Sequence, residues 1–256
     1  MADRDLRAAV HELAASPLLL VALDFDGTMA PLVDRPEDAR AIPEARAAML
    51  RLAGLPETRV ALISGRSLDS LVHVADPPAS VLLSGSHGVE SRLDAEPRVT
   101  LDDGERQRLY ALRAVLDGVA DSVENAFVEV KPAGFALHTR LVAPEGAAEA
   151  QRRAREGTAA IDGLTVRSGS NVLEFSVRST TKGDAVRMLR DFAGAASVLF
   201  AGDDVTDEDG FAVLGPGDLG LKCGAGPTAA EFSVADPAAV AAVLHELADA
   251  REQKYS

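Results

Sequence analysis

Residues 18–28, LLLVALDFDGT, decide the fold: an apolar run long enough for one buried strand leads directly into Asp24 and Asp26. Open α/β sheets place their ligand sites at the carboxyl ends of strands, which is where these carboxylates fall. Two aspartates spaced i, i+2 on a strand would face the same side, so their repulsion favours a bound cation or a retained proton. Gly27 permits a sharp turn, and Thr28 offers a hydroxyl and a backbone donor. A simple Asp-Gly turn would account for the dipeptide but poorly for the whole pentapeptide.

A second acidic cluster, AGDDVTDED at residues 201–209, also follows an apolar strand. Magnesium prefers hard oxygen ligands and takes few of them from protein, so we predict Asp203 as a metal ligand. Asp204 and Asp207 are predicted to lie near the metal or to touch it. The helix expected to begin at Thr206 leaves an alternative open, because its dipole stabilises acids in the first turn without any metal.

Two isolated polar positions complete the requirements of a phosphate site. Ser64 and Gly65 follow the apolar run at 59–63, and Lys182 precedes a predicted helix. A phosphate beside carboxylates needs hydrogen-bond donors and positive charge, which these residues supply. Taken singly, Ser-Gly is also ordinary turn chemistry and a lysine is usually a solvated surface charge.

Strands and helices alternate at both ends of the chain, a pattern typical of a parallel sheet. The expected strands lie at 18–23, 59–63, 81–83 and 197–201, and the expected helices at 43–52, 68–74, 182–192 and 237–250, the last capped by Asp236. The middle reads as helix, hairpin, helix and two strands: 105–116, 127–131, 135–141, 144–155, 164–167 and 172–177. We therefore predict an α/β protein with a Rossmann-like three-layer parallel-sheet core at 1–104 and 180–256. An inserted αββαββ domain of α+β class is predicted at 105–179.

The composition narrows the classes of partner. With 26 basic and 40 acidic residues the net charge is −14, which repels nucleic acid and anionic lipid. The single cysteine, Cys223, cannot form an intrachain disulfide, and no signal peptide or membrane span is evident. We expect a soluble, cytoplasmic monomer that acts on a small molecule and binds neither nucleic acid nor membrane.

The motifs resemble those of the haloacid dehalogenase-like (HAD) hydrolases, whose four signatures match Asp24-x-Asp26-Gly27-Thr28, Ser64, Lys182 and Gly202-Asp203-Asp204 in order. The resemblance implies a HAD fold in which Asp24 is the nucleophile that forms an aspartyl-phosphate and Asp26 is the general acid and base. It also implies that Mg²⁺ is held by Asp24, Asp203 and the backbone carbonyl of Asp26. Ser64, Gly65 and Lys182 would bind the phosphate.

A narrower resemblance, to the trehalose-6-phosphate phosphatases, spans nearly the whole chain. It rests on the segments at 64–66, 85–90, 129–131, 138–140, 169–174, 182–183 and 202–208. It implies a C2B-type cap that chooses the sugar through Glu129, Lys131 and Glu174, with Arg66 and His87 as further substrate contacts. Glu129 and Lys131 share one face of a predicted strand, although spacing alone is equally consistent with a solvated sheet face.

The expected reaction is hydrolysis of trehalose 6-phosphate to trehalose and phosphate, the last step of trehalose biosynthesis. Three alternatives remain open. A related phosphatase would act on another phosphosugar, such as mannosylglycerate, sucrose or glucosylglycerol phosphate, or on an aminocyclitol mimic of trehalose. A sugar phosphomutase would share the aspartyl-phosphate, and a non-catalytic sensor would have lost the nucleophile or the acid, both of which are present here.

Overall fold

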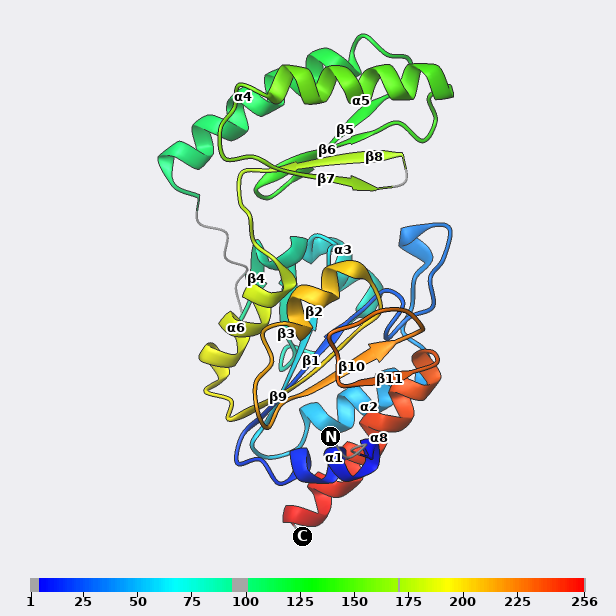
Figure 1. Ribbon diagram of the computed structural model, residues 1–256, viewed down its shortest axis with the longest axis vertical. Helices are drawn as coiled ribbons and strands as arrows, with labels where there is room; N and C mark the ends of the chain where they lie inside the picture. The colour runs from blue at the N-terminus through cyan, green and yellow to red at the C-terminus, as the bar shows by residue number, and fades with distance from the viewer. Residues whose placement is uncertain (1–4, 94–100, 170, 256) are drawn as a thin grey trace. The chain divides into compact units, whose positions relative to one another are not determined.

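The computed structural model describes residues 5–93, 101–169 and 171–255. The chain divides into two compact units, one formed by Met1–Arg98 with Thr180–Ser256 and the other by Val99–Ser179 (Figure 1). The two ends of the chain therefore build one unit together, and the middle of the chain builds the other.

The first unit is organised by a seven-stranded sheet in the order β11-β10-β9-β1-β2-β3-β4, parallel except that β4 runs antiparallel to β3. Its strands are β1 (Leu19–Asp24), β2 (Thr58–Ile63), β3 (Leu82–Gly85), β4 (Glu90–Arg92), β9 (Ser197–Gly202), β10 (Leu219–Cys223) and β11 (Phe232–Val234). In the register, Asp24 lies opposite Ile63, and Leu23 lies opposite Ala201. The ends of β1, β2 and β9 are thus level, and the residues that follow them meet at one edge.

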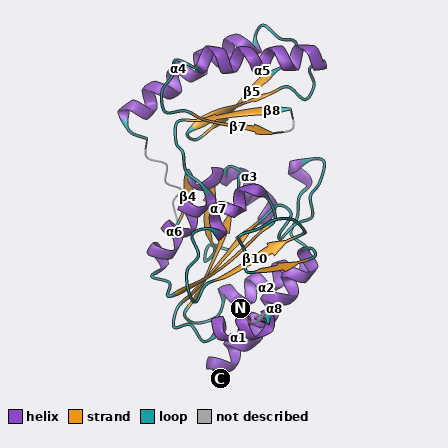
Figure 2. Ribbon diagram, in the orientation of Figure 1, coloured by secondary structure: helices purple, strands orange, loops and turns teal. Residues whose placement is uncertain are grey.

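Helices cover both faces of this sheet, which confirms the three-layer core (Figure 2). One face carries α1 (Leu6–Ala14), α2 (Pro43–Ala53), α3 (Leu68–Ala75) and α8 (Pro237–Tyr255), and the other carries α6 (Lys182–Ala193) and α7 (Glu208–Phe211). All six residues of β1 are buried because alternate side chains enter the two layers. Val21 packs in the first layer, and Leu20 packs in the second.

Local capping explains where two helices begin. The Thr181 side chain accepts from the Asp184 amide while the Asp184 carboxylate accepts from the Thr181 amide, so α6 starts at Lys182. Asp236 caps α8 as predicted. The helix expected to begin at Thr206 differs: Asp204, not Thr206, caps a 3₁₀ turn, η3 (Val205–Asp207), that precedes the short α7.

The second unit is a four-stranded antiparallel sheet in the order β5-β6-β8-β7, with two helices on one face. Its elements are α4 (Asp103–Ala120), β5 (Phe127–Lys131), β6 (Gly134–His138), α5 (Pro144–Thr158), β7 (Thr165–Gly169) and β8 (Val172–Ser176). Leu137, Leu173 and Phe175 pack against the helices. The opposite face carries Glu129 and Glu174, so it is polar.

Four elements of the core, α1, β4, β10 and β11, were not predicted from the sequence. The strands β4 and β11 have three residues each, and β10 contains a glycine and a lysine, so none presents a strong apolar period. The strand expected at 135–141 also ends earlier, at His138.

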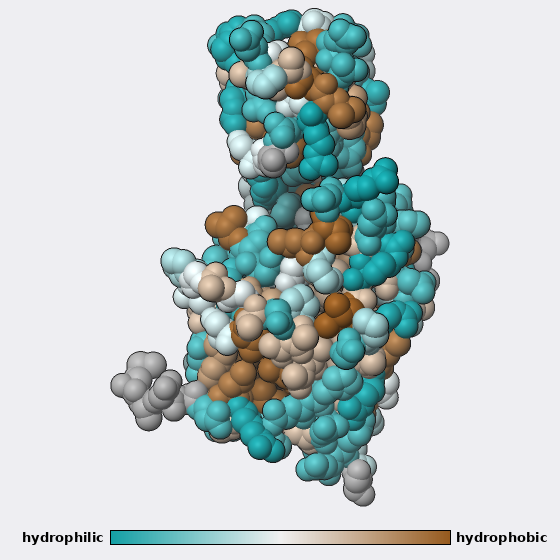
Figure 3. All heavy atoms as spheres, turned by 90° about the vertical axis from the view of Figure 1, so that its right-hand side faces the viewer, coloured by the Kyte–Doolittle hydropathy of each residue, from teal (hydrophilic) through white to brown (hydrophobic). Residues whose placement is uncertain are grey.

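On the face shown in Figure 3, hydrophilic side chains predominate and apolar ones gather in small patches. This surface agrees with a chain in which 26% of residues are charged. Over the ranges that the structure describes, no helix combines the length and apolar composition that a membrane crossing requires.

Candidate active site

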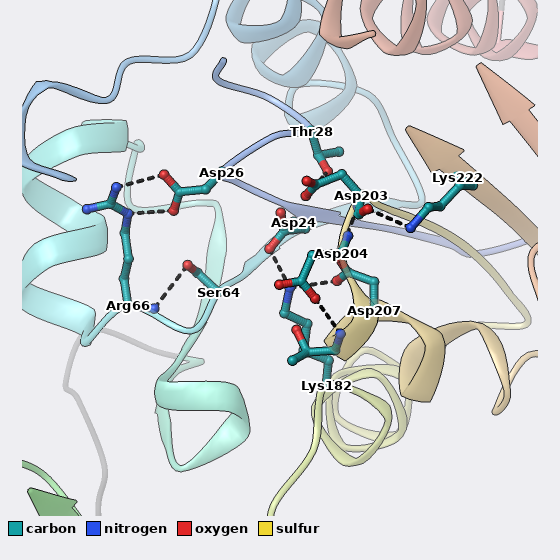
Figure 4. A network of polar contacts seen from close by, with 11 residues as sticks. Asp24, Asp26, Thr28, Ser64, Arg66, Lys182, Asp203, Asp204, Asp207 and Lys222 are labelled. Carbon is teal, nitrogen blue, oxygen red and sulfur yellow. Dashed lines mark hydrogen bonds and ion pairs between the residues drawn. The ribbon is translucent and has the colours of Figure 1, made fainter. Parts of the chain in front are cut away.

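The centre of the site is a buried ion-pair chain between Asp24, Lys182 and Asp207 (Figure 4). The Lys182 ammonium donates to Asp24 Oδ1 at 2.7 Å and to Asp207 Oδ1 at 2.6 Å. All three residues are at most 4% exposed. A buried lysine ammonium requires paired carboxylates, and Asp24 and Asp207 supply them. Lys182 is therefore a component of the site rather than a surface charge.

Asp207 braces the second acidic cluster. Its Oδ2 accepts the backbone amides of Asp203 and Asp204, at 3.0 and 2.9 Å, while its Oδ1 accepts from Lys182. Both oxygens are therefore committed to protein donors. Asp207 joins the lysine to the loop that presents Asp203, and Asp204 is committed to capping η3.

Gly27 allows Asp203 to approach the loop that follows β1. Its φ of +82° is rarely adopted by residues with a side chain, and a Cβ there would lie 2.1 Å from Asp203 Oδ2. The Thr28 hydroxyl donates to Asp203 Oδ1 at 3.4 Å. The glycine of the motif is thus required by contact between the two acidic segments as well as by the turn.

Asp26 and Arg66 form a second, separate pair. Arg66 donates from Nε and Nη2 to the two carboxylate oxygens of Asp26, at 2.6 and 2.7 Å. Figure 4 shows that the Asp26 side chain points toward Arg66, whereas Asp24 points toward Lys182. The two aspartates therefore have separate partners, and Asp26 lies beyond the strand, because β1 ends at Asp24.

The loop of Ser64 and Gly65 is held by the turn that contains His87. The His87 amide donates to Ser64 O at 3.1 Å, and the Ser86 amide donates to Arg66 O at 2.6 Å. Ser86 and His87 both have positive φ, 49° and 55°. Such strained backbone persists where surrounding contacts enforce it. A Cβ on Gly65 would lie 2.7 Å from His87 Nε2, so the imidazole packs directly over the phosphate-loop candidate.

The electrostatics of the acidic cluster leave negative charge uncompensated. Burial raises the pKa of Asp24 well above its usual value, although Lys182 opposes this. Burial and the Asp207 carboxylate raise the pKa of Asp203 to about 6. Burial alone would lower the pKa of Lys182, but Asp24 and Asp207 raise it above the ordinary lysine value. The lysine is therefore charged, and the carboxylates still lack a full counter-charge.

The site fits a divalent cation. Carboxylate oxygens of Asp24, Asp203 and Asp207 lie within 4.8 Å of one another. Since Asp207 is fully engaged, Asp24 and Asp203 are the carboxylates with oxygens to spare. Oxygen donors and excess negative charge are what a hard divalent ion requires.

The second unit gathers its predicted residues on the polar sheet face. Lys131 Nζ lies 2.9 Å from Glu129 Oε1 and 3.8 Å from Glu174 Oε1. His138 Nε2 lies 2.8 Å from the other Glu129 oxygen, Oε2. The pairing of β5 and β8 with β6 produces this cluster, which can bind a ligand rich in hydroxyl groups.

Lys222 is a further polar residue near the site, and it was not predicted from the sequence. Its ammonium is buried on β10 and donates to the backbone carbonyl of Asp203 at 2.5 Å, with Glu208 Oε1 at 3.7 Å. A lysine inside the otherwise apolar run LGLKC was the available signal, since a charge within a buried strand requires a partner.

A parallel sheet with a nucleophile candidate at the end of β1, a lysine from α6 and acids after β9 defines the class of HAD-like hydrolases. The model of the Trehalose-phosphatase family matches residues 22–238. The chain belongs to the trehalose-phosphatase family.

Among the relatives is the trehalose-6-phosphate phosphatase of Escherichia coli, 31% identical over 90% of this chain and 87% of its own length. A bifunctional trehalose-6-phosphate synthase/phosphatase of Thermoproteus tenax is 32% identical over 92% of this chain. The chain corresponds to 33% of that protein's length. The solved structure of Aspergillus fumigatus trehalose-6-phosphate phosphatase has a TM-score of 0.69 and 25% identity, over 96% of this chain and 98% of the other.

Proposed function

We propose that this chain hydrolyses trehalose 6-phosphate to trehalose and phosphate through an aspartyl-phosphate on Asp24. The observation that carries the proposal is the buried Asp24 carboxylate at the end of β1, held at one oxygen by Lys182. That contact leaves the other oxygen for attack on phosphorus. The printed activities of the E. coli and A. fumigatus relatives support this substrate.

In the first step the free Asp24 oxygen bonds to phosphorus and the ester bond to the sugar breaks. Asp26 gives its proton to the leaving sugar oxygen. The Ser64 hydroxyl and the Gly65 amide donate to the non-bridging phosphate oxygens, and the Lys182 ammonium balances their charge. Arg66 and His87 lie beside this loop and are proposed to contact the substrate.

In the second step water attacks phosphorus and Asp26 takes its proton. The bond between phosphorus and Asp24 breaks, which releases phosphate and restores the carboxylate. The same group serves as acid and then as base, so no further proton carrier is needed. Asp207 acts through Asp203 and Lys182, which it holds in place, and Asp204 caps the turn η3 that carries Asp207.

The metal is proposed to be Mg²⁺, held by Asp24, Asp203 and the backbone carbonyl of Asp26. When bound, it would offset the repulsion between the phosphate and the carboxylates. The raised pKa of Asp203, caused chiefly by burial, supports a requirement for a cation there.

The segment from residue 105 to residue 179 is proposed to be the cap that selects the sugar, with Glu129, Lys131 and Glu174 as its contacts. Residues 1–104 and 180–256 would form the catalytic core.

The net charge of −14 and the lone cysteine support a cytoplasmic protein that binds neither nucleic acid nor membrane. Size-exclusion chromatography with light scattering tests the expected monomer.

The deciding experiment measures phosphate release from trehalose 6-phosphate with Mg²⁺, beside glucose 6-phosphate and sucrose 6-phosphate. Asp24→Asn should abolish turnover, and Asp69→Asn, an exposed change of the same size on α3, should not. Activity that survives Asp24→Asn would exclude the mechanism. A preference for another sugar would keep the mechanism and replace the substrate, and dependence on a bisphosphate activator would indicate a mutase.

A further inference from the structure

The second unit (Val99–Ser179), called the cap unit from here on, presents an aromatic pair beside its charged cluster. Phe127 on β5 lies directly opposite His138 on β6, and the two rings stack with centroids 4.6 Å apart and planes 8° from parallel. Strand periodicity places both rings on the face that carries Glu129 and Lys131. Phe127 is about half exposed, so the pair forms part of the polar face rather than the apolar core.

Glu129 is held from both sides. Its Oε2 lies 2.8 Å from His138 Nε2 and its Oε1 lies 2.9 Å from Lys131 Nζ. The hydrogen bond to His138, followed by the effects of Lys131, lowers the pKa of Glu129 to about 2, although partial burial opposes this. Glu129 is therefore an ionised acceptor, and His138 Nε2 must carry the hydrogen in this contact.

Two partners on two oxygens restrict the rotation of the Glu129 carboxylate. A carboxylate has about four acceptor positions, so about two remain for a ligand. Sugar hydroxyl groups are donors that can occupy these positions. Side-chain ordering before binding reduces the entropy lost when the ligand arrives, so a fixed Glu129 binds hydroxyl groups more tightly than a free one.

We propose that His138 is a positioning residue of the sugar site: its Nε2–H fixes the Glu129 carboxylate, and the Phe127 ring fixes the imidazole. The inference rests on the proposed function, because the ligand it concerns is the sugar of a phosphosugar. It assigns His138 to affinity for the sugar and not to the phosphate chemistry.

A matched pair of variants separates the hydrogen bond from the bulk of the side chain. In His138→Gln the amide nitrogen reaches approximately the position of Nε2. The side chain of His138→Asn is too short to place its amide nitrogen there. Both variants lose the stacked ring. We expect His138→Asn to raise KM for trehalose 6-phosphate about fivefold to tenfold, and His138→Gln to stay within about threefold of the wild type.

Neither His138 variant should change the rate of the phosphate-transfer steps. The kcat for trehalose 6-phosphate and the rate with p-nitrophenyl phosphate, which has no sugar to bind, should stay within about twofold in both variants. Val130→Thr, on the opposite face of β5, serves as a control for disturbance of the sheet. Thermal melting reports whether each variant is folded.

Three outcomes test the positioning role of His138. Equal KM values for the Asn and Gln variants would overturn the role of the hydrogen bond, and so would a fall in kcat without a change in KM. If the wild type does not act on trehalose 6-phosphate, the proposed function fails instead. Titration of the wild type and both variants with trehalose then decides the inference: weaker binding by His138→Asn alone supports it, and equal or absent binding overturns it.

Discussion

Arg66 holds both carboxylate oxygens of Asp26, at 2.6 and 2.7 Å, and its backbone amide donates to Ser64 Oγ at 3.1 Å. One residue therefore connects the proposed phosphate donor to the proposed general acid. A carboxylate engaged at both oxygens must give up one of these bonds to reach a leaving group. Arg66 thus determines where Asp26 lies before substrate binds.

Substitution of Arg66 should affect substrates according to their leaving group. We expect Arg66→Gln to lower kcat for trehalose 6-phosphate about 10- to 100-fold, because Asp26 loses its orientation for proton transfer. The rate with p-nitrophenyl phosphate should fall much less, since nitrophenolate leaves without a proton. Ser70→Ala, which removes the other partner of this guanidinium, is the control. Equal losses on both substrates would assign Arg66 to the phosphate instead.

Gly27 and Gly224 offer a matched test of the contact with Asp203. Both have positive φ, +82° and +87°, but a Cβ on Gly27 meets Asp203 at 2.1 Å, whereas a Cβ on Gly224 meets nothing within 4 Å. Each Gly→Ala change should cost about 1 kcal/mol of unfolding free energy from backbone strain. Only Gly27→Ala should also weaken Mg²⁺ binding, measured by calorimetry. Similar Mg²⁺ affinities in the two variants would contradict the role of close approach.

Lys222 should matter for activity although it lies on β10, away from the recognised motifs. Lys222→Met removes the donor to the Asp203 carbonyl, and we expect about a 10-fold loss of kcat/KM with about 1–3 kcal/mol of stability lost. Glu208→Gln keeps that donor and is the control. A Lys222→Met enzyme with unchanged kcat/KM and Mg²⁺ dependence would show that the contact is only structural.

Acid should weaken the cap unit through Glu105. Its hydrogen bond from Arg178 lowers the pKa of Glu105 from 4.5 to about 2, with Nε–Oε1 at 2.7 Å. A carboxyl group whose pKa is lowered by folding stabilises the fold at pH values above its pKa in the unfolded chain. This stabilisation is lost as the pH falls through its pKa in the folded protein. The unfolding free energy of the wild type should therefore exceed that of Glu105→Gln near about pH 5, by an amount on the order of 1 kcal/mol, and the two should converge toward about pH 2. Melting temperatures measured over this pH range report the difference. A difference that stays constant with pH would contradict this linkage.

The sequence by itself determined the class of fold and the positions of the chemistry. Short apolar runs predict buried strands, and Asp24, Ser64 and Asp203 each follow such a run. Because the strands are parallel, the sheet brings these three residues to one edge. The helix expected at 182–192 is likewise confirmed, since α6 spans Lys182–Ala193. These are local signals, which periodicity and turn chemistry carry without knowledge of the rest of the chain.

Only the tertiary structure decided which groups are partners. Arg66 could have faced solvent, Asp207 could have been a metal ligand, Lys222 lay outside every motif, and the motif that contains His138 named no partner for it. The contacts of these residues with Asp26, Lys182, Asp203 and Glu129 join different strands and loops. Hydrogen bonds and ion pairs depend on distances of a few tenths of an ångström. Such distances are set by strand register and loop packing across long separations in sequence, and residue spacing along one segment does not encode them.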